Sequence, residues 1–179
     1  MKIQNFIGQT QAVSQINEIN TKREHSNKTG EPFHFRPLLF KGLTGLGKTE
    51  LGKLTAHCME DCNFTELPPS SGWNEARKLM NKVASYDEDK KTFSALPSVI
   101  LIDEAHTQKV LSEMLKMLYN DKKGTNHISR NGQDFFYDPA QHLVIFASNR
   151  TLDAAIEGRC YKIQLVPYTK SEKIRLIQS

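Results

Sequence analysis

The segment that most restricts how this chain can fold is a glycine-rich octapeptide. Residues 42–49 read Gly-Leu-Thr-Gly-Leu-Gly-Lys-Thr and match the phosphate-loop pattern G-x-x-x-x-G-K-[ST]. Its glycines let successive backbone N–H groups converge on one anion, and the positive end of a following helix faces the same point. Lys48 can then reach terminal phosphates and the Thr49 hydroxyl can ligate Mg²⁺. A chance match in a chain of this length is on the order of one in a hundred, judged from average residue usage.

The surrounding pattern predicts the strand before this loop and the helix after it. Short apolar runs that end at glycine, proline or polar residues indicate buried strands at 38–40, 62–67, 98–102, 143–147 and 161–165. Apolar residues at helical spacing predict helices at 10–25, 51–59 (starting from about Lys48), 73–85, 110–119 and 152–156, with 26–30 as a loop. Alternating strands and helices predict an α/β fold with a mostly parallel sheet between two helical layers.

Two carboxylates follow the strand predicted at 98–102. Asp103 and Glu104 come directly after Val99-Ile100-Leu101-Ile102, at the sheet edge where ligands bind in open α/β folds. Asp103 is placed to hold Mg²⁺, and Glu104 to act as the general base that polarises an attacking water. Taken alone, this pair is equally well read as an ordinary strand end. Together with the phosphate loop, it predicts a nucleotide-hydrolysing site.

Two further polar residues are candidates for the same site. Asn149 ends the strand predicted at 143–147 and can reach the γ-phosphate or the attacking water, although asparagine also ends many strands through turn chemistry. Arg159 precedes the last strand. It is either a surface arginine with a solvated head or a finger that projects into the ATP site of a neighbouring subunit.

A β-hairpin is predicted around Asn131–Gly132. This dipeptide lies between Ile128 and the aromatic run Phe135-Phe136-Tyr137, a strong two-residue turn signal. One interpretation packs an aromatic face on the core of the domain. Because alternation sends Phe136 to the face opposite its neighbours, the other interpretation leaves one face exposed to a protein partner or to nucleotide bases.

Bulk properties exclude several classes of protein. The 179 residues are 38% apolar and 25% charged, which predicts one globular domain rather than a disordered chain. No apolar run approaches the ~20 residues that span a bilayer, and the first residues contain no signal-peptide core, so no membrane association and a cytoplasmic location are expected. The net charge of +4 permits a polyanionic partner without requiring one. The three cysteines have no metal-site spacing, and small buried thiols are expected.

These motifs, in this order, resemble the AAA+ superfamily of ATPases, and within it the RuvB family of Holliday-junction branch-migration motors. The matching segments are Phe6-Ile7-Gly8-Gln9 at the adenine-holding opening motif, Leu46-Gly47-Lys48-Thr49 and Ile102-Asp103-Glu104-Ala105-His106 at the Walker boxes, Asn149 at sensor 1, Arg159 at the arginine finger, Pro167-Tyr168-Thr169 at the start of the lid, and the Asn131–Gly132 hairpin before sensor 1.

The resemblance implies a P-loop NTPase αβα sandwich with five core strands in the order 5-1-4-3-2. Residues 1–168 would form the nucleotide-binding domain and residues 169–179 the start of a helical lid. ATP and Mg²⁺ are the implied cofactors, and Thr49 and Asp103 are the implied magnesium ligands. The implied nucleotide contacts are Phe6, Ile7, Gly8, Gly42, Leu43, Thr44, Gly45, Leu46, Gly47, Lys48, Thr49, Glu50 and Tyr168, and the implied catalytic residues are Lys48, Glu104, Asn149 and Arg159.

The sequence also departs from the RuvB pattern. It stops one helix into the lid, so the sensor-2 arginine has no counterpart because Arg175 lies too early, and the winged-helix DNA-binding domain has none either. Residues 103–106 also spell the box of DEAH helicases, which need a second RecA-like domain that this chain has no room for.

Three functions are therefore compared. The first is an ATP-hydrolysing subunit of a ring, expected to be a hexamer, that acts on DNA in recombination or replication and contacts a protein partner through the hairpin. The second is an ATP-switched loader or adaptor that binds a replication or recombination protein without motor activity. The third is a regulatory module in which the nucleotide is structural.

Overall fold

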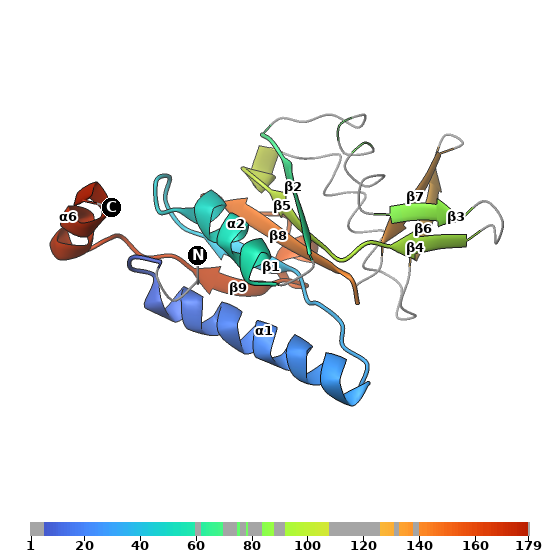
Figure 1. Cartoon of the computed structure of the whole chain (residues 1–179). Coiled ribbons are helices and arrows are strands. Elements are labelled where there is room, and N and C mark those ends of the chain that lie inside the picture. Colours follow the sequence, from blue (N-terminus) through green and yellow to red (C-terminus); the bar gives the residue numbers. More distant parts are fainter. Residues whose placement is uncertain are drawn as a thin grey trace.

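A computed structural model describes residues 6–59, 62–69, 75, 78, 84–87, 92–107, 126–130, 133–137 and 140–178 (Figure 1). The helices are α1 (Thr10–Thr29), α2 (Lys48–Cys58), the 3-10 turn η2 (Ala105–Thr107), α5 (Ala154–Glu157) and α6 (Lys170–Gln178). The strands are β1 (Leu38–Lys41), β2 (Asn63–Leu67), β3 (Ala84–Asp87), β4 (Thr92–Ala95), β5 (Ser98–Ile102), β6 (Asn126–Arg130), β7 (Gln133–Tyr137), β8 (His142–Ser148) and β9 (Tyr161–Gln164).

Five of these strands form a parallel sheet in the order β2-β5-β8-β1-β9. Counted along the chain, the sheet strands run 2-3-4-1-5, which is the predicted order 5-1-4-3-2 reversed. The α/β sandwich with a hairpin insertion is therefore confirmed. All five predicted core strands exist, with ends within a residue or two of those predicted.

The core lies largely between the sheet and two helices. α1 contributes Ala12, Val13 and Ile16, and α2 contributes Leu51, Leu54 and Ala56, to one buried cluster with alternate residues of the sheet strands. The intervening strand residues point to the other face, because successive side chains alternate. They are buried as well: Leu39, Ile100, Ile102, Val144 and Phe146. Burial of both faces explains why the central strands are nearly continuous apolar runs.

The strand register brings the predicted site residues to one edge. Lys41 at the end of β1 pairs with Ser148 at the end of β8, and Ile102 at the end of β5 pairs with Phe146. Since the strands are parallel, the loops that follow β1, β5 and β8 share the carboxyl edge of the sheet. The phosphate-loop segment, the acidic pair and Asn149 begin there.

The first helix is longer than predicted. Residues 26–29 were expected to form a loop, but α1 continues to Thr29 and ends at Gly30, which is left-handed with φ 73°. The Gly30 N–H bonds to Ser26 O, and the Thr29 hydroxyl bonds to His25 O. A polar, exposed last turn closed by glycine extends the helix without apolar residues, so helical spacing alone missed it.

Two hairpins precede central strands. β6 and β7 pair antiparallel, as predicted, with Ile128 opposite Phe135; the predicted turn residues 131 and 132 lie outside the described residues. β3 and β4 form a second hairpin that the sequence did not predict. The predicted end of the helix at 73–85 is therefore wrong, since residues 84 and 85 are strand. Glu75 and Lys78 are helical, and the helix predicted at 110–119 lies outside the described residues.

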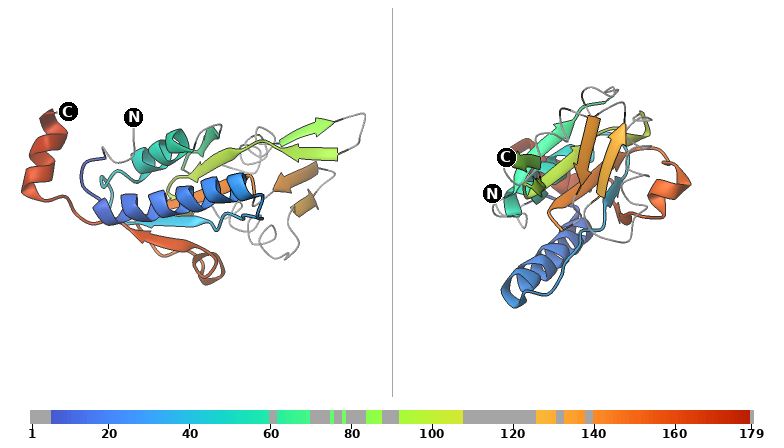
Figure 2. Two further views of the ribbon diagram at one scale, coloured as in Figure 1. Left: turned by 60° about the horizontal axis from the view of Figure 1, so that its bottom comes forward. Right: turned by 90° about the vertical axis from the view of Figure 1, so that its right-hand side faces the viewer.

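The hairpins and the C-terminal helix occupy opposite ends of the molecule. β4 ends just before β5 begins and β7 just before β8, so both hairpins adjoin the amino edge of the sheet, and β4 contacts β7 (Figures 1 and 2). α6 lies beyond the opposite end and buries none of its residues (Figure 1). None of the helices that the structure describes has both the length and the apolar character needed to cross a bilayer.

Candidate nucleotide-binding site

The glycine-rich loop between β1 and α2 has the backbone of an anion cradle. Gly45 and Gly47 have φ angles of 82° and 80°, in the left-handed region that favours glycine. Gly47 is also the N-cap of α2, so the first free N–H groups of that helix face the loop. A Cβ at Gly47 would lie 3.0 Å from the Phe6 ring and 3.0 Å from the Tyr168 hydroxyl. The positive φ favours glycine there, and a Cβ would also crowd the Phe6 and Tyr168 side chains.

Lys48 directs its charge along the same loop. The residue is only 6% exposed, and its ammonium group donates to Gly42 O and Leu43 O, both at 2.9 Å. These two carbonyls hold the side chain beside the loop rather than in solvent. A buried cation next to converging N–H groups is suited to a phosphate. Leu43 itself is 67% exposed, and Glu50 is exposed on the first turn of α2.

Thr49 and Asp103 meet across the sheet edge. The Thr49 hydroxyl donates to Asp103 Oδ2 at 3.1 Å, and Asp103 Oδ1 accepts from the Glu104 N–H at 2.9 Å. The Asp103 N–H donates to Leu67 O, which fixes the end of β5 against β2. Hydroxyl and carboxylate oxygens are hard ligands of the kind that Mg²⁺ prefers.

The described part of the chain provides no all-protein metal cage beside this pair. Among the residues that the structure describes, no cluster of three or more His, Cys, Asp or Glu side chains could hold a metal ion. Mg²⁺ at nucleotide sites is commonly bound by one or two protein oxygens together with substrate phosphates and water. The donor set at Thr49 and Asp103 fits that mode, in which phosphate and water oxygens would supply the remaining ligands.

Glu104 and Asn149 follow β5 and β8, two neighbouring strands of the sheet. Glu104 has a φ of 44°, an unusual backbone conformation for a residue other than glycine, and its carboxylate lies 3.4 Å from His106 Nδ1. Asn149 Nδ2 donates to Thr44 Oγ1 at 3.2 Å, so this side chain contacts the glycine-rich loop directly. The sequence named both residues. It did not name His106 as a site residue.

Residues 6–8 lie beside the glycine-rich loop, on the side of the site where α6 begins. Gly8 is left-handed with φ 71°, and a Cβ there would lie 2.8 Å from the Tyr168 ring. The Tyr168 hydroxyl donates to Leu46 O at 3.1 Å, and burial raises the pKa of this phenol. Phe6 and Tyr168 therefore meet beside Gly47, and Gly8 lies against the Tyr168 ring. Ile7, between Phe6 and Gly8 in the sequence, is half-buried.

Gln9 makes a contact beside the site, although it was not among the predicted site residues. Its side-chain amide donates to Val166 O at 2.7 Å and accepts from the Val166 N–H at 2.9 Å. This bidentate pairing fastens the segment before α1 to the segment after β9, and Gln9 is 5% exposed. Gln9 is the last residue of the Phe-Ile-Gly-Gln motif, and this motif is the feature of the sequence from which its importance could have been predicted.

Arg159 is not brought to the phosphate loop of its own chain. It follows α5 and precedes β9, at the amino edge of the sheet, where its carbonyl accepts from Arg36 Nε at 2.9 Å. The Arg159 guanidinium donates to Ala155 O at 2.6 Å. The other named residues lie at the carboxyl edge.

Glu157 anchors the turn that carries Arg159, and the sequence missed it. Its carboxylate accepts from Lys162 at 2.8 Å, Lys41 at 3.2 Å and the Leu152 N–H at 3.0 Å. The hydrogen bond from Lys162 is the main cause that lowers the pKa of Glu157 from 4.5 to about 2, helped by the Leu152 N–H and Lys41 against the effect of burial. Lys41 immediately precedes the glycine-rich loop, so one carboxylate joins both segments.

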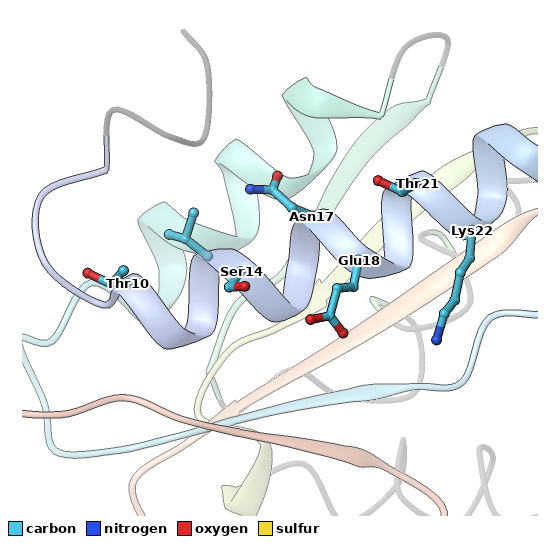
Figure 3. A pocket seen from close by; sticks show the side chains of 7 residues that line it. Thr10, Ser14, Asn17, Glu18, Thr21 and Lys22 are labelled. Atoms are coloured by element: carbon cyan, nitrogen blue, oxygen red, sulfur yellow. The ribbon is translucent and has the colours of Figure 1, made fainter.

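A separate hollow lies on the outer side of α1. It has a volume of about 580 Å³ and is lined by Thr10, Val13, Ser14, Asn17, Glu18, Thr21 and Lys22 (Figure 3). All of these residues belong to one helix, and none belongs to the predicted site. The hollow is open, and its lining of hydroxyl, amide, carboxylate and ammonium groups from a single helix offers no converging set of catalytic groups. The carboxyl edge of the sheet, where the glycine-rich loop lies, is the better candidate site.

Comparison with known families agrees with this geometry. The family model AAA, "ATPase family associated with various cellular activities", matches residues 38–168. The chain belongs to the AAA ATPase family. The matched range begins at β1 and ends at Tyr168, so it contains the glycine-rich loop, the acidic pair and Asn149.

Solved structures that are similar to this AAA ATPase in fold include a motor protein. The RuvB Holliday-junction branch-migration motor of Thermotoga maritima matches with a TM-score of 0.65 and 20% identity over 99% of this chain. Two single-residue variants of that RuvB match with the same TM-score and 19% identity. The chain spans about half of these proteins, 51% to 52% of their length. A comparison with curated protein sequences finds no match.

Proposed function

We propose that this AAA ATPase binds ATP with Mg²⁺ at the carboxyl edge of the sheet and hydrolyses it to ADP and phosphate. The observation that supports the proposal best is the convergence of a loop cation, a hydroxyl–carboxylate pair and a second carboxylate on one edge. Lys48 lies within the loop, Thr49 contacts Asp103 at 3.1 Å, and Glu104 follows directly.

Each side chain has a role in this proposal. Lys48 exchanges its two carbonyl partners for oxygens of the terminal phosphates. Thr49 and Asp103 hold Mg²⁺, which when bound supplies positive charge that offsets the phosphate charge. Glu104 accepts a proton from the attacking water, and Asn149 orients that water or the γ-phosphate from the neighbouring strand.

Three substitutions test these roles. Lys48→Ala should weaken ATP binding at least about tenfold, or about 1.4 kcal/mol, as measured by calorimetry on the folded protein. Glu104→Gln keeps the size of the side chain but accepts no proton, so it should bind ATP and barely hydrolyse it. Asp103→Asn should instead weaken the Mg²⁺-dependent binding of ATP. Unchanged ATP affinity in Lys48→Ala would refute the assignment of the phosphate loop.

We further propose that the chain works as a subunit of a ring and acts on DNA in recombination or replication. The support is the fold shared with RuvB and the position of Arg159 before β9, at the amino edge of the sheet. Sedimentation with a slowly hydrolysed ATP analogue, with and without branched DNA, tests assembly. Stoichiometric capture of a protein in ATP, without DNA-stimulated turnover, would favour the loader or adaptor instead.

Arg159 is proposed to complete the site of an adjacent subunit. A mixture of Glu104→Gln and Arg159→Ala subunits pairs an intact Glu104 with an intact Arg159 across some interfaces. The mixture should therefore recover part of the ATPase activity that each variant lacks alone. No recovery in a mixture that co-assembles would show that Arg159 does not act between subunits.

A further inference from the structure

His106 connects two elements of the candidate site. It lies in η2, just after the acidic pair, and its Nδ1 atom is 3.2 Å from Ser148 Oγ and 3.4 Å from Glu104 Oε2. The side chains of His106 and Glu104 are 15% and 27% exposed, and Ser148 is fully buried. The imidazole therefore stands between the proposed general base and the last residue of β8.

The hydrogen-bond partners of Ser148 determine which nitrogen of the His106 ring carries a proton. The single hydroxyl hydrogen of Ser148 points to Arg150 O at 2.8 Å, and Ser148 Oγ accepts from the Arg150 N–H at 3.1 Å. Ser148 Oγ can therefore only accept a further hydrogen bond, not donate one. His106 Nδ1 must then carry a hydrogen and donate it. The same N–H faces the Glu104 carboxylate, and this contact is favourable because an ionised carboxylate accepts hydrogen bonds.

The Ser148 side chain also shapes the turn that holds Asn149. Because Ser148 Oγ bonds to both the N–H and the C=O of Arg150, it fixes the backbone on either side of Asn149. Asn149 in turn donates to Thr44 in the glycine-rich loop. A continuous set of contacts thus runs from the loop through the end of β8 to His106 and Glu104.

We propose that His106 is a positioning residue for Glu104. Its Nδ1–H is shared between Ser148 and the Glu104 carboxylate, and it holds that carboxylate in register with the turn that carries Asn149. The two groups that must act on the same water are thereby fixed relative to one another. This inference rests on the proposed role of Glu104 as general base.

Two amide substitutions separate this role from simple packing. In His106→Asn, the amide nitrogen can occupy the place of Nδ1, whereas in His106→Gln it lies farther out, near the place of Nε2. His106→Leu has similar bulk and no donor. His106→Asn should keep most of the kcat, while the other two should lose roughly tenfold to a hundredfold, the scale of a misplacement of about 1 Å. KM and calorimetric ATP affinity should stay within about twofold, because no phosphate contact changes.

A double substitution shows whether His106 acts through Glu104. In a Glu104→Gln background, His106→Leu should cause no further loss of turnover, since the group that it positions is gone. If His106→Leu has the kcat of the unsubstituted protein, or if His106→Asn fails as badly as His106→Leu in a folded protein, the inference is wrong. Normal turnover by Glu104→Gln alone would instead refute the proposed general base, so the two failures are distinguishable.

Discussion

Glu157→Gln is the substitution whose effect on stability follows most directly from the structure. Glu157 is 8% exposed, and its carboxylate accepts hydrogen bonds from two lysines and the Leu152 N–H. Glutamine keeps the shape and one oxygen for Leu152, but it removes the negative charge that Lys41 and Lys162 face. The variant should therefore lose the charge contribution and retain the packing.

The magnitude follows from the pKa of Glu157. A change from 4.5 to about 2 on folding corresponds to about 3 kcal/mol of stability at neutral pH. The Lys162 side chain is 53% exposed, so water and salt screen part of this energy, and about 2 kcal/mol is expected. Because folding lowers this pKa, the stabilisation is fully present above pH 4.5 and is lost as the pH falls from 4.5 towards 2.

Urea unfolding of both proteins at pH 7 and pH 3 measures this contribution. The free energy of unfolding of Glu157→Gln should be about 2 kcal/mol lower at pH 7, and the gap should shrink to less than about half at pH 3. Glu18→Gln, at an exposed carboxylate on α1, is the control and should change stability by less than about 0.5 kcal/mol. A gap that is equal at both pH values would show that the charge of Glu157 is not the source of the stabilisation.

Three further outcomes are expected. Burial leaves Cys160 3% exposed and raises its pKa to about 12, so iodoacetamide at pH 8 should leave this thiol unlabelled in the native protein and label it in urea, as read by mass spectrometry. Gly8→Ala should lower the unfolding free energy by more than Gly30→Ala, because both have left-handed φ angles but only a Cβ at Gly8 would meet the Tyr168 ring; equal losses would contradict the contact. Substituting Ala for Phe136 in the β6–β7 hairpin should leave calorimetric ATP affinity within about twofold, and a larger loss would mean that the hairpin supports the site.

The parts of the fold that the sequence predicted are those determined by local pattern. The phosphate loop, the five core strands and the acidic pair each depend on a few adjacent residues whose type is required by their chemistry or burial. Strand order is different, because spacing along the chain does not determine which strands pair. It was predicted only through the resemblance to AAA+ proteins.

The errors lie where pairing between segments decides the structure. Residues 84–87 read Ala-Ser-Tyr-Asp, without the alternation of a half-buried strand, and become β3 by pairing with β4. The apolar spacing from Trp73 to Val83 predicted a helix. Its extension to residues 84 and 85 was wrong, because these two residues belong to β3. Propensity could not resolve this boundary, since a strand in a hairpin depends on its partner.

The site residues that the sequence did not predict were missed for one physical reason. Glu157, His106 and Ser148 are each ordinary in sequence, and their importance arises from partners brought together by the sheet. Lys41 meets Glu157 only because β1 and β9 pair, and His106 meets Ser148 only because β5 and β8 pair. Motif reasoning identifies groups that contact a ligand, whereas the groups that hold them in place appear only once the strand order is known.

The two hairpins and the candidate site are joined by the same pair of strands. β5 carries the β3–β4 hairpin before its first residue and Asp103 after its last, and β8 carries the β6–β7 hairpin before its first residue and Asn149 after its last. Both strands are buried at every position, and the seven residues of β8 span roughly 20 Å. A partner bound to the hairpins would leave the nucleotide site open, because the two lie at opposite edges of the sheet. The hairpins would still be connected to Glu104 and Asn149 through β5 and β8, whose residues are all buried.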